Sequence, residues 1–74
     1  MNNHTVIGVD LAKTVFQVAV QHGQQITSNK KLTRSKLVEF MTQQPPSVVV
    51  MEACYTAHYW ARVCEAHGHT VRLI

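Results

Sequence analysis

The chain has 74 residues, of which 46% are hydrophobic and 15% are charged, and its formal net charge is +3 at pH 7. This length allows one small domain, and the composition is that of a folded chain rather than a disordered one. No apolar run reaches the roughly 20 residues that a membrane span needs, and the N-terminus lacks the features of a signal peptide. The two cysteines have no metal-binding spacing, so we expect free thiols in a cytoplasmic protein.

The N-terminal half of the chain predicts three strands joined by short turns. Residues 6–9 form a short apolar run that ends at Asp10, and residues 14–20 form a second run rich in β-branched side chains. Gly23 marks the next turn. Residues 24–32 then predict a third strand, whose polarity is typical of a sheet edge.

A helix and a buried strand are predicted next. Thr33 is a suitable helix N-cap, and it is followed by an apolar stripe of Leu37, Phe40 and Met41. The helix should end before Pro45, because proline lacks an amide donor and restricts the residue that precedes it. Residues 47–51 are almost all apolar, which is the pattern of a strand inside a parallel sheet.

The last part of the chain predicts a second helix and a fifth strand. The helix covers residues 55–67, ends before Gly68, and is expected to bury a stripe of Tyr59, Val63 and Ala66. Residues 69–74 are apolar and strand-like, and we expect the chain to be a fragment of a longer protein. The predicted order is β-β-β-α-β-α-β, an α/β fold in which two right-handed crossovers add parallel strands.

Two of the four acidic residues directly follow apolar strands. Asp10 closes the first predicted strand and Glu52 closes the fourth, whereas Glu39 and Glu65 fall on helices, where exposure to solvent explains them. An acid at the end of a buried strand is costly unless it is paired, exposed or bound to a metal. If these two strands are adjacent and parallel, the carboxylates meet at one edge and suit Mg²⁺ or Mn²⁺. Alternatively, Asp10 caps a turn and Glu52 caps the following helix.

Basic residues are concentrated in one short segment, which contains Lys30, Lys31, Arg34 and Lys36. The segment fits a phosphate-rich partner, although a solvated turn and helix start explain it equally well. Lys13 follows Asp10 by three residues and is placed to meet a phosphate, or else simply forms an exposed hairpin tip.

The histidines and aromatic residues give weaker signals. The five histidines form no zinc-ligand pattern, so we expect ordinary surface or core roles for them. The cluster of Tyr55, Tyr59 and Trp60 fits a helix core better than a surface that stacks on nucleic-acid bases.

Several segments, taken in order, resemble one known family. They are residues 8–18 (GVDLAKTVFQV), 51–54 (MEAC), 57–62 (AHYWAR) and 68–74 (GHTVRLI). Together they resemble the DEDD transposases of bacterial insertion sequences, the one-hundred-and-ten group, across essentially the whole chain. One departure is visible, because many members of that family have Gly where this chain has Tyr55.

The resemblance implies a ribonuclease-H-like (RuvC-like) fold that is truncated here, with residues 1–74 as the N-terminal part of a catalytic domain. By motif match, Asp10 is the first D and Glu52 the E of four catalytic, metal-binding acids. The other two acids, and a C-terminal domain with a nucleophilic serine, would follow Ile74 in the parent protein.

The resemblance also implies a function. The parent would be a transposase or site-specific recombinase, related to the invertases of pilin genes, that cuts and rejoins DNA with Mg²⁺ or Mn²⁺. Its partners would be DNA, a guide RNA from the same element and further copies of itself, and the fragment alone would be inactive.

Two other functions remain open. A non-catalytic nucleic-acid-binding or assembly module would explain the basic segment. An actin-like or sugar-kinase ATPase would explain the initial strand, acid and hairpin, but residues 11–14 contain no Gly for a phosphate-binding turn.

Overall fold

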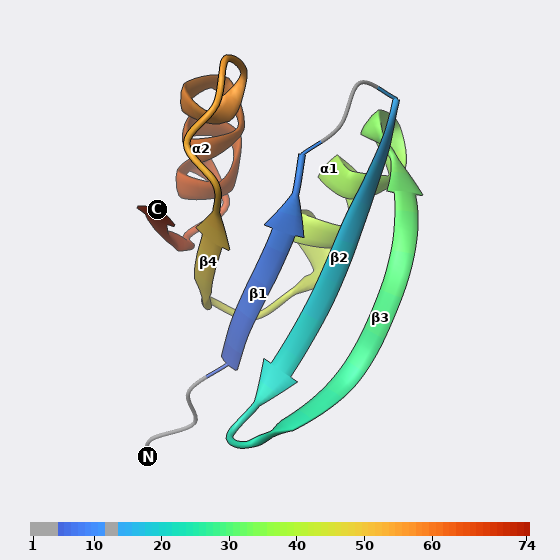
Figure 1. Cartoon of the computed structure of the whole chain (residues 1–74). Coiled ribbons are helices and arrows are strands. Elements are labelled where there is room, and N and C mark those ends of the chain that lie inside the picture. Colours follow the sequence, from blue (N-terminus) through green and yellow to red (C-terminus); the bar gives the residue numbers. More distant parts are fainter. Residues whose placement is uncertain (1–4, 12–13) are drawn as a thin grey trace.

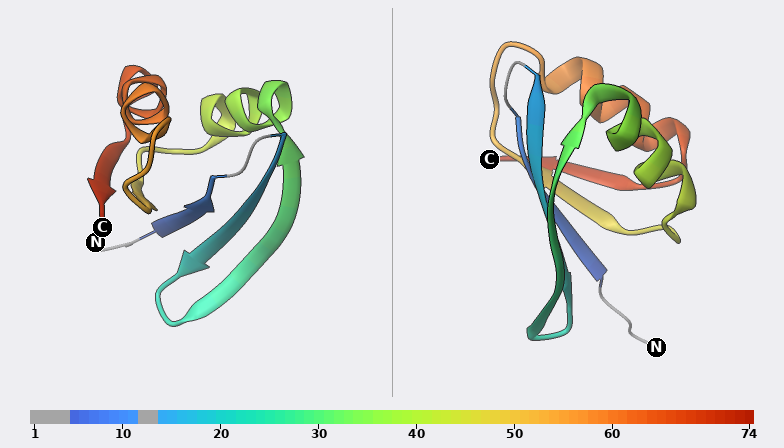
Figure 2. Two further views of the ribbon diagram at one scale, coloured as in Figure 1. Left: turned by 45° about the horizontal axis from the view of Figure 1, so that its top comes forward. Right: turned by 90° about the vertical axis from the view of Figure 1, so that its right-hand side faces the viewer.

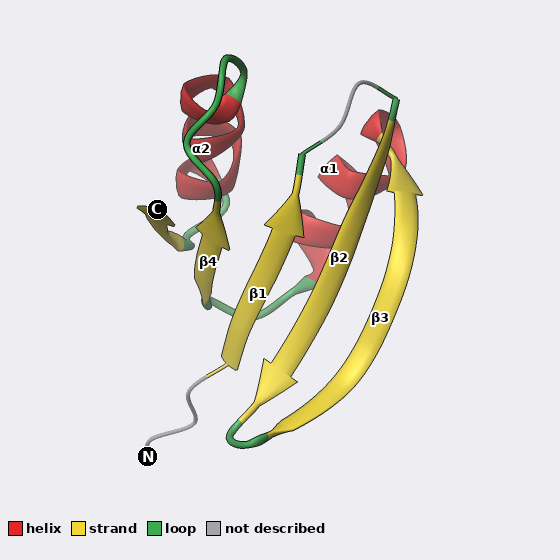
Figure 3. Cartoon of the chain, viewed as in Figure 1, coloured by secondary structure: helices red, strands yellow, loops and turns green. Residues whose placement is uncertain are grey.

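Five strands form one mixed sheet with two helices packed on it in a computed structural model, which describes residues 5–11 and 14–74 (Figures 1 and 3). The elements in chain order are β1 (Thr5–Asp10), β2 (Val15–His22), β3 (Gln25–Thr33), α1 (Arg34–Gln43), β4 (Val48–Met51), α2 (Ala57–Ala66) and β5 (Thr70–Leu73). This order is the predicted β-β-β-α-β-α-β, so the α/β class is confirmed.

The sheet has the strand order β3-β2-β1-β4-β5. β1, β2 and β3 are paired antiparallel, whereas β4 runs parallel to β1 and β5 runs parallel to β4. The polar strand β3 lies at one edge, as its sequence predicts. The centre of the sheet is therefore the parallel pair β1 and β4 together with the long strand β2.

Both helices lie on the same side of the sheet, as the two views of Figure 2 show. The side chains that point toward the helices are apolar and buried: Ile7, Val9, Phe16, Val18, Val49 and Met51. No described helix covers the opposite side, which we call the open face of the sheet. Its central residues, Gly8, Ala19 and Val50, are partly exposed.

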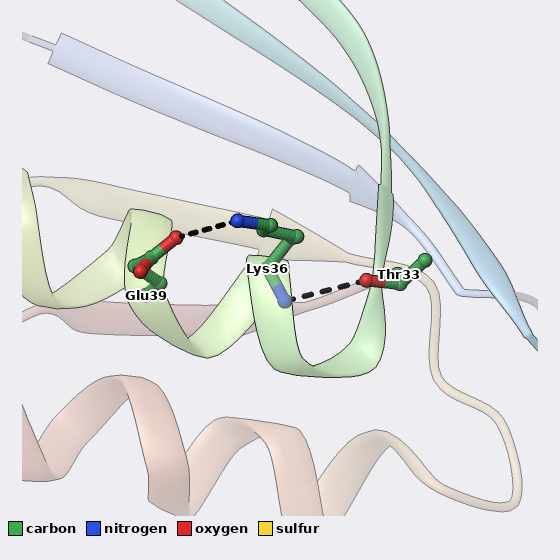
Figure 4. Close-up of polar contacts among 3 residues, drawn as sticks. All are labelled: Thr33, Lys36 and Glu39. Atoms are coloured by element: carbon green, nitrogen blue, oxygen red, sulfur yellow. Dashed lines mark hydrogen bonds and ion pairs between the residues drawn. The ribbon is translucent and has the colours of Figure 1, made fainter.

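Helix α1 begins where the sequence predicts. The Thr33 hydroxyl oxygen accepts a hydrogen bond from the Lys36 backbone amide at 3.4 Å, which satisfies one of the amides at the helix start (Figure 4). One turn further on, the Lys36 ammonium pairs with Glu39 at 3.4 Å. The predicted stripe packs on the sheet through Leu37 and Met41, which are both buried.

Helix α2 is rotated relative to the prediction, and the predicted stripe is wrong. The buried residues are Ala57, Trp60 and Cys64. Tyr59 is 47% exposed, so it does not lie in the core. Because one residue turns a helix by about 100°, burying Trp60 instead of Tyr59 moves the whole inward face. Trp60 takes this position because it packs edge-to-face on Phe16, with 5.1 Å between ring centroids.

A buried histidine ties three elements together. The backbone amide of Ser47 donates to His69 Nδ1 at 3.1 Å, so the ring proton is on Nε2, which donates to the Met41 carbonyl at 2.9 Å. These bonds join the end of α1 to the starts of β4 and β5. His69 thus has the structural role that the absence of a zinc pattern indicates.

The two cysteines should differ sharply in reactivity. Cys54 is exposed and Cys64 is buried. Burial, assisted by the nearby charge of Glu65, raises the pKa of the Cys64 thiol from 9.0 to about 11. At pH 8 we expect a thiol reagent to modify the exposed Cys54 quickly and Cys64 about 100-fold more slowly than an unshifted thiol, because the raised pKa of Cys64 lowers its thiolate fraction by about that factor. Equal rates for both thiols in the folded chain would contradict this packing of α2.

Candidate metal centre

Two acids separated by 41 residues of chain come to the same level of the sheet. Asp10 is the last residue of β1, and Glu52 directly follows β4. These strands are adjacent and parallel (Figure 1). Val9 lies opposite Met51, and the residue that follows each of them is an acid: Asp10 at the end of β1 and Glu52 directly after β4. The first and fourth strands are therefore adjacent and parallel, as the prediction of a shared site for the two acids requires.

Asp10 and Glu52 both line a hollow of about 470 Å³ on the open face. The other residues around it are Gly8, Val9, Gln17, Ala19, Asn29, Val50, Met51 and Ile74. Both acids are exposed at its rim, where their charged form keeps its contact with water. This exposure explains how the two acids can lie at the ends of buried strands, because water still hydrates their charges.

The alternative role for Glu52 as a helix cap is wrong. Helix α2 starts at Ala57, and its N-cap position is occupied by Thr56, so Glu52 lies well before the helix. The exposed turn that follows Glu52 also accommodates the departure from the family pattern at Tyr55. The Tyr55 side chain is 100% exposed, so its bulk meets no obstacle within the described structure.

Two carboxylates supply hard oxygen ligands, which suit Mg²⁺ or Mn²⁺. Within residues 5–11 and 14–74, no group of three or more His, Cys, Asp or Glu side chains is arranged to hold a metal ion. Asp10 and Glu52 can therefore contribute two protein ligands and leave most of the coordination shell to water, a substrate phosphate or other carboxylates. A centre of this kind fits Mg²⁺, which usually keeps several water ligands.

The basic segment does not form one surface. Lys31 lies opposite Gln17 on the open face, in the same row as Asp10. Lys30 lies opposite Val18 on the helix side, with its ammonium 5.7 Å from the centre of the Phe40 ring. Neighbouring residues of a strand point to opposite faces, so two adjacent lysines cannot serve one patch.

The other predicted phosphate contacts are also dispersed. The Arg34 guanidinium lies 5.4 Å from the centre of the Trp60 ring, and Lys36 is paired with Glu39 on α1. Lys13 lies outside the described residues. Binding of nucleic acid by these residues stays a prediction, and Lys31 is the one that the sheet places in the row of the two acids.

Sequence reasoning missed the polar residues next to the acids. Gln17 and Asn29 line the hollow, and the Gln17 side-chain amide donates to the Asn29 side-chain carbonyl. Arg72, on β5, lies opposite Val50 and so also points to the open face. The alternation of side chains along each strand was the available signal, but it identifies neighbours only once the pairing of the strands is known.

The chain has clear relatives among bacterial proteins. It is 49% identical over 73 residues to a protein of Pseudomonas aeruginosa named "Probable family 20 transposase". This alignment covers 97% of the chain and 22% of the relative. It is 41% identical over 76 residues to the transposase for insertion sequence element IS1328 of Yersinia enterocolitica. That alignment covers 100% of the chain and 22% of the relative.

A third relative is the transposase for insertion sequence element IS1111A of Coxiella burnetii, 31% identical over 75 residues, covering 100% of this chain and 21% of that protein. The chain is similar to transposases of insertion sequences. It spans about a fifth of the length of these relatives. No family model and no solved structure matches it significantly. In the described part of the chain, no helix is long and apolar enough to cross a membrane.

Proposed function

We propose that residues 1–74 are the N-terminal part of the catalytic domain of an insertion-sequence transposase, which acts in the cytoplasm on DNA. One observation carries the proposal: in a chain similar to transposases, Asp10 and Glu52 each directly follow the paired residues Val9 and Met51 of the adjacent parallel strands β1 and β4. The carboxyl ends of parallel strands are the usual place for a ligand in an α/β sheet.

The transposase would be of the DEDD type with a ribonuclease-H-like (RuvC-like) fold. Asp10 would be its first acid and Glu52 its second. The strand order β3-β2-β1-β4-β5, with both acids at strand ends, supports this subtype. Two further aspartates would come from the longer parent protein and complete the acidic set.

Asp10 and Glu52 would hold Mg²⁺ or Mn²⁺. When bound, the metal supplies charge stabilisation at a phosphodiester and activation of an attacking oxygen. The chain's own acids would fix the cation at the rim of the hollow, and Lys31 would hold the phosphate backbone nearby, since it lies in the same row of the open face. A guide RNA and further copies of the protein would be the other partners of the parent.

The test is DNA cleavage by the full-length protein that contains this chain, with Mg²⁺ and with its guide RNA present. We expect Asp10→Asn and Glu52→Gln each to reduce cleavage to background, whereas Glu65→Gln, an exposed acid on α2, leaves it unchanged. We also expect the 74-residue chain alone to cut no DNA.

Cleavage that persists in both site variants would contradict the proposed catalytic role. Nucleic-acid binding that weakens with salt but survives both substitutions, without any cleavage by the full-length protein, would favour a non-catalytic binding module.

A further inference from the structure

Gln17 lies directly across the β1–β2 pair from Asp10. The register of the two antiparallel strands makes Asp10 and Gln17 partners. Glu52 directly follows β4, which lies on the other side of β1. Side chains directly opposite each other on an antiparallel pair have Cβ atoms roughly 4.5–5.5 Å apart, and all three residues line the hollow of the open face. One polar, uncharged side chain is therefore placed next to the two acids.

A hydrogen bond to Asn29 determines which atom of the Gln17 amide is already engaged. The amide nitrogen, Nε2, donates to the side-chain oxygen of Asn29 on β3. Because an amide group carries its donor hydrogens on nitrogen and its acceptor lone pairs on oxygen, the Gln17 Oε1 atom keeps its full capacity as an acceptor or ligand. Within residues 5–11 and 14–74, no hydrogen bond engages this oxygen. The atom that Gln17 can offer to a further group is thus an oxygen.

An amide oxygen suits the metal centre that we propose for Asp10 and Glu52. Mg²⁺ and Mn²⁺ prefer hard oxygen atoms, and an amide carbonyl supplies such an atom without a charge. The described residues offer two carboxylates, which leave most of an octahedral shell unfilled. A neutral oxygen adds to the ligands around the cation without increasing the repulsion among the acids.

We propose that Gln17 supplies a third, neutral oxygen to the cation shared by Asp10 and Glu52, and that Asn29 is a positioning residue for the Gln17 amide. Engaging the nitrogen with Asn29 keeps the oxygen available, as groups behind a metal ligand commonly do. The inference rests on the proposed function, because it concerns the same cation. It does not require an uncovered sheet, since acids from the longer parent protein would fill other positions of the same shell.

The test measures the affinity of the chain for Mn²⁺ by electron paramagnetic resonance in variants of Gln17. Gln17→Met keeps the length of the side chain but has no hard oxygen, so it should weaken Mn²⁺ binding about tenfold. Gln17→Glu keeps an oxygen and adds a charge, so it should bind Mn²⁺ at least as tightly as the original chain. Asn29→Ala should also weaken binding, whereas Asn29→Asp, which keeps the acceptor for Gln17 Nε2, should not.

The matched control is Gln21→Met. Gln21 lies on the same strand and the same face as Gln17, but opposite Val6 and not opposite an acid. This variant should bind Mn²⁺ as the original chain does, and urea unfolding should give both methionine variants the same midpoint. In NMR of the original chain, substoichiometric Mn²⁺ should broaden the side-chain amide signals of Gln17 and leave those of Gln21 sharp.

Asp10→Asn separates failure of this inference from failure of the proposed centre. If Asp10→Asn loses Mn²⁺ while Gln17→Met binds it as the original chain does, the centre stands and the role of Gln17 is overturned. Weaker binding by Gln17→Glu would also overturn that role, because Gln17 would then act through its N–H donors. An original chain that holds no Mn²⁺ would contradict both the centre and its third oxygen. Unchanged binding by Asn29→Ala would overturn the positioning role of Asn29.

Discussion

Asp10→Asn is expected to lower the affinity of the chain for Mn²⁺ at least about 100-fold. Asn keeps the size of the side chain but removes the negative charge and one hard oxygen from the proposed centre, for which the described residues offer two carboxylates. Loss of a residue that merely orients a metal ligand already costs about 10–100-fold in affinity, so loss of a ligand itself should reach at least the upper end of that range. Electron paramagnetic resonance of free Mn²⁺ measures this loss directly.

A second, stricter prediction concerns whether Asp10 and Glu52 share one cation. If Asp10 and Glu52 hold the same ion, the double variant with Glu52→Gln should lose little more affinity than either single variant, because the ion is already released. Glu65→Gln, on the exposed side of α2, is the control and should bind Mn²⁺ as the original chain does. A single variant that loses one Mn²⁺ ion but keeps a second at unchanged affinity would indicate two separate weak sites and not a shared centre.

Trp60→Ala is expected to destabilise the chain by about 3–5 kcal/mol, the usual range for removing a buried large aromatic side chain. Trp60 is 2% exposed and lies 5.1 Å, ring centre to ring centre, from both Phe16 and Tyr59. Trp60 joins α2 to Phe16 of β2, and the Arg34 guanidinium at the start of α1 lies against its ring. The truncation therefore loosens both helices at once.

The stability lost in Trp60→Ala is large for a chain of this size. Globular domains have a stability of roughly 0.05–0.15 kcal/mol per residue, so a chain of 74 residues has about 4–11 kcal/mol to lose. Urea unfolding followed by circular dichroism should show a much lower midpoint for Trp60→Ala, or no cooperative transition. Tyr55→Ala removes a side chain that is 100% exposed and should change stability by no more than about 0.5 kcal/mol. Equal midpoints for the two variants would mean that α2 does not pack through Trp60.

Local patterns in the sequence were sufficient to predict every helix and strand. Residues 47–51 could be recognised as a central strand because they are almost entirely apolar, and Thr33 could be recognised as an N-cap from its side chain and the stripe behind it. The rotation of α2 could not be predicted in the same way. Tyr59 and Trp60 are adjacent and both aromatic, and only the tertiary partner Phe16 decides which of them is buried.

The acids of the site were predictable, but their polar neighbours were not. Asp10 and Glu52 follow apolar runs, and the end of a strand is visible in the sequence. Which residue of β3 lies opposite Gln17 depends on the hairpin turn and on an irregularity between Val20 and Gln21, which shifts the register. A shift of one residue would have exchanged Lys30 and Lys31 between the two faces, so the division of the basic segment could be seen only in the structure.

The central claim, that one divalent cation is shared by Asp10 and Glu52, is tested most directly by paramagnetic broadening in two-dimensional NMR of the ¹⁵N-labelled chain. Substoichiometric Mn²⁺ should broaden the backbone amide signals of Asp10 and Glu52 together, at the same metal concentration, before any other signals outside the hollow. Broadening that begins at the exposed histidines His58, on α2, and His67, directly after it, or that affects one acid without the other, would contradict the claim.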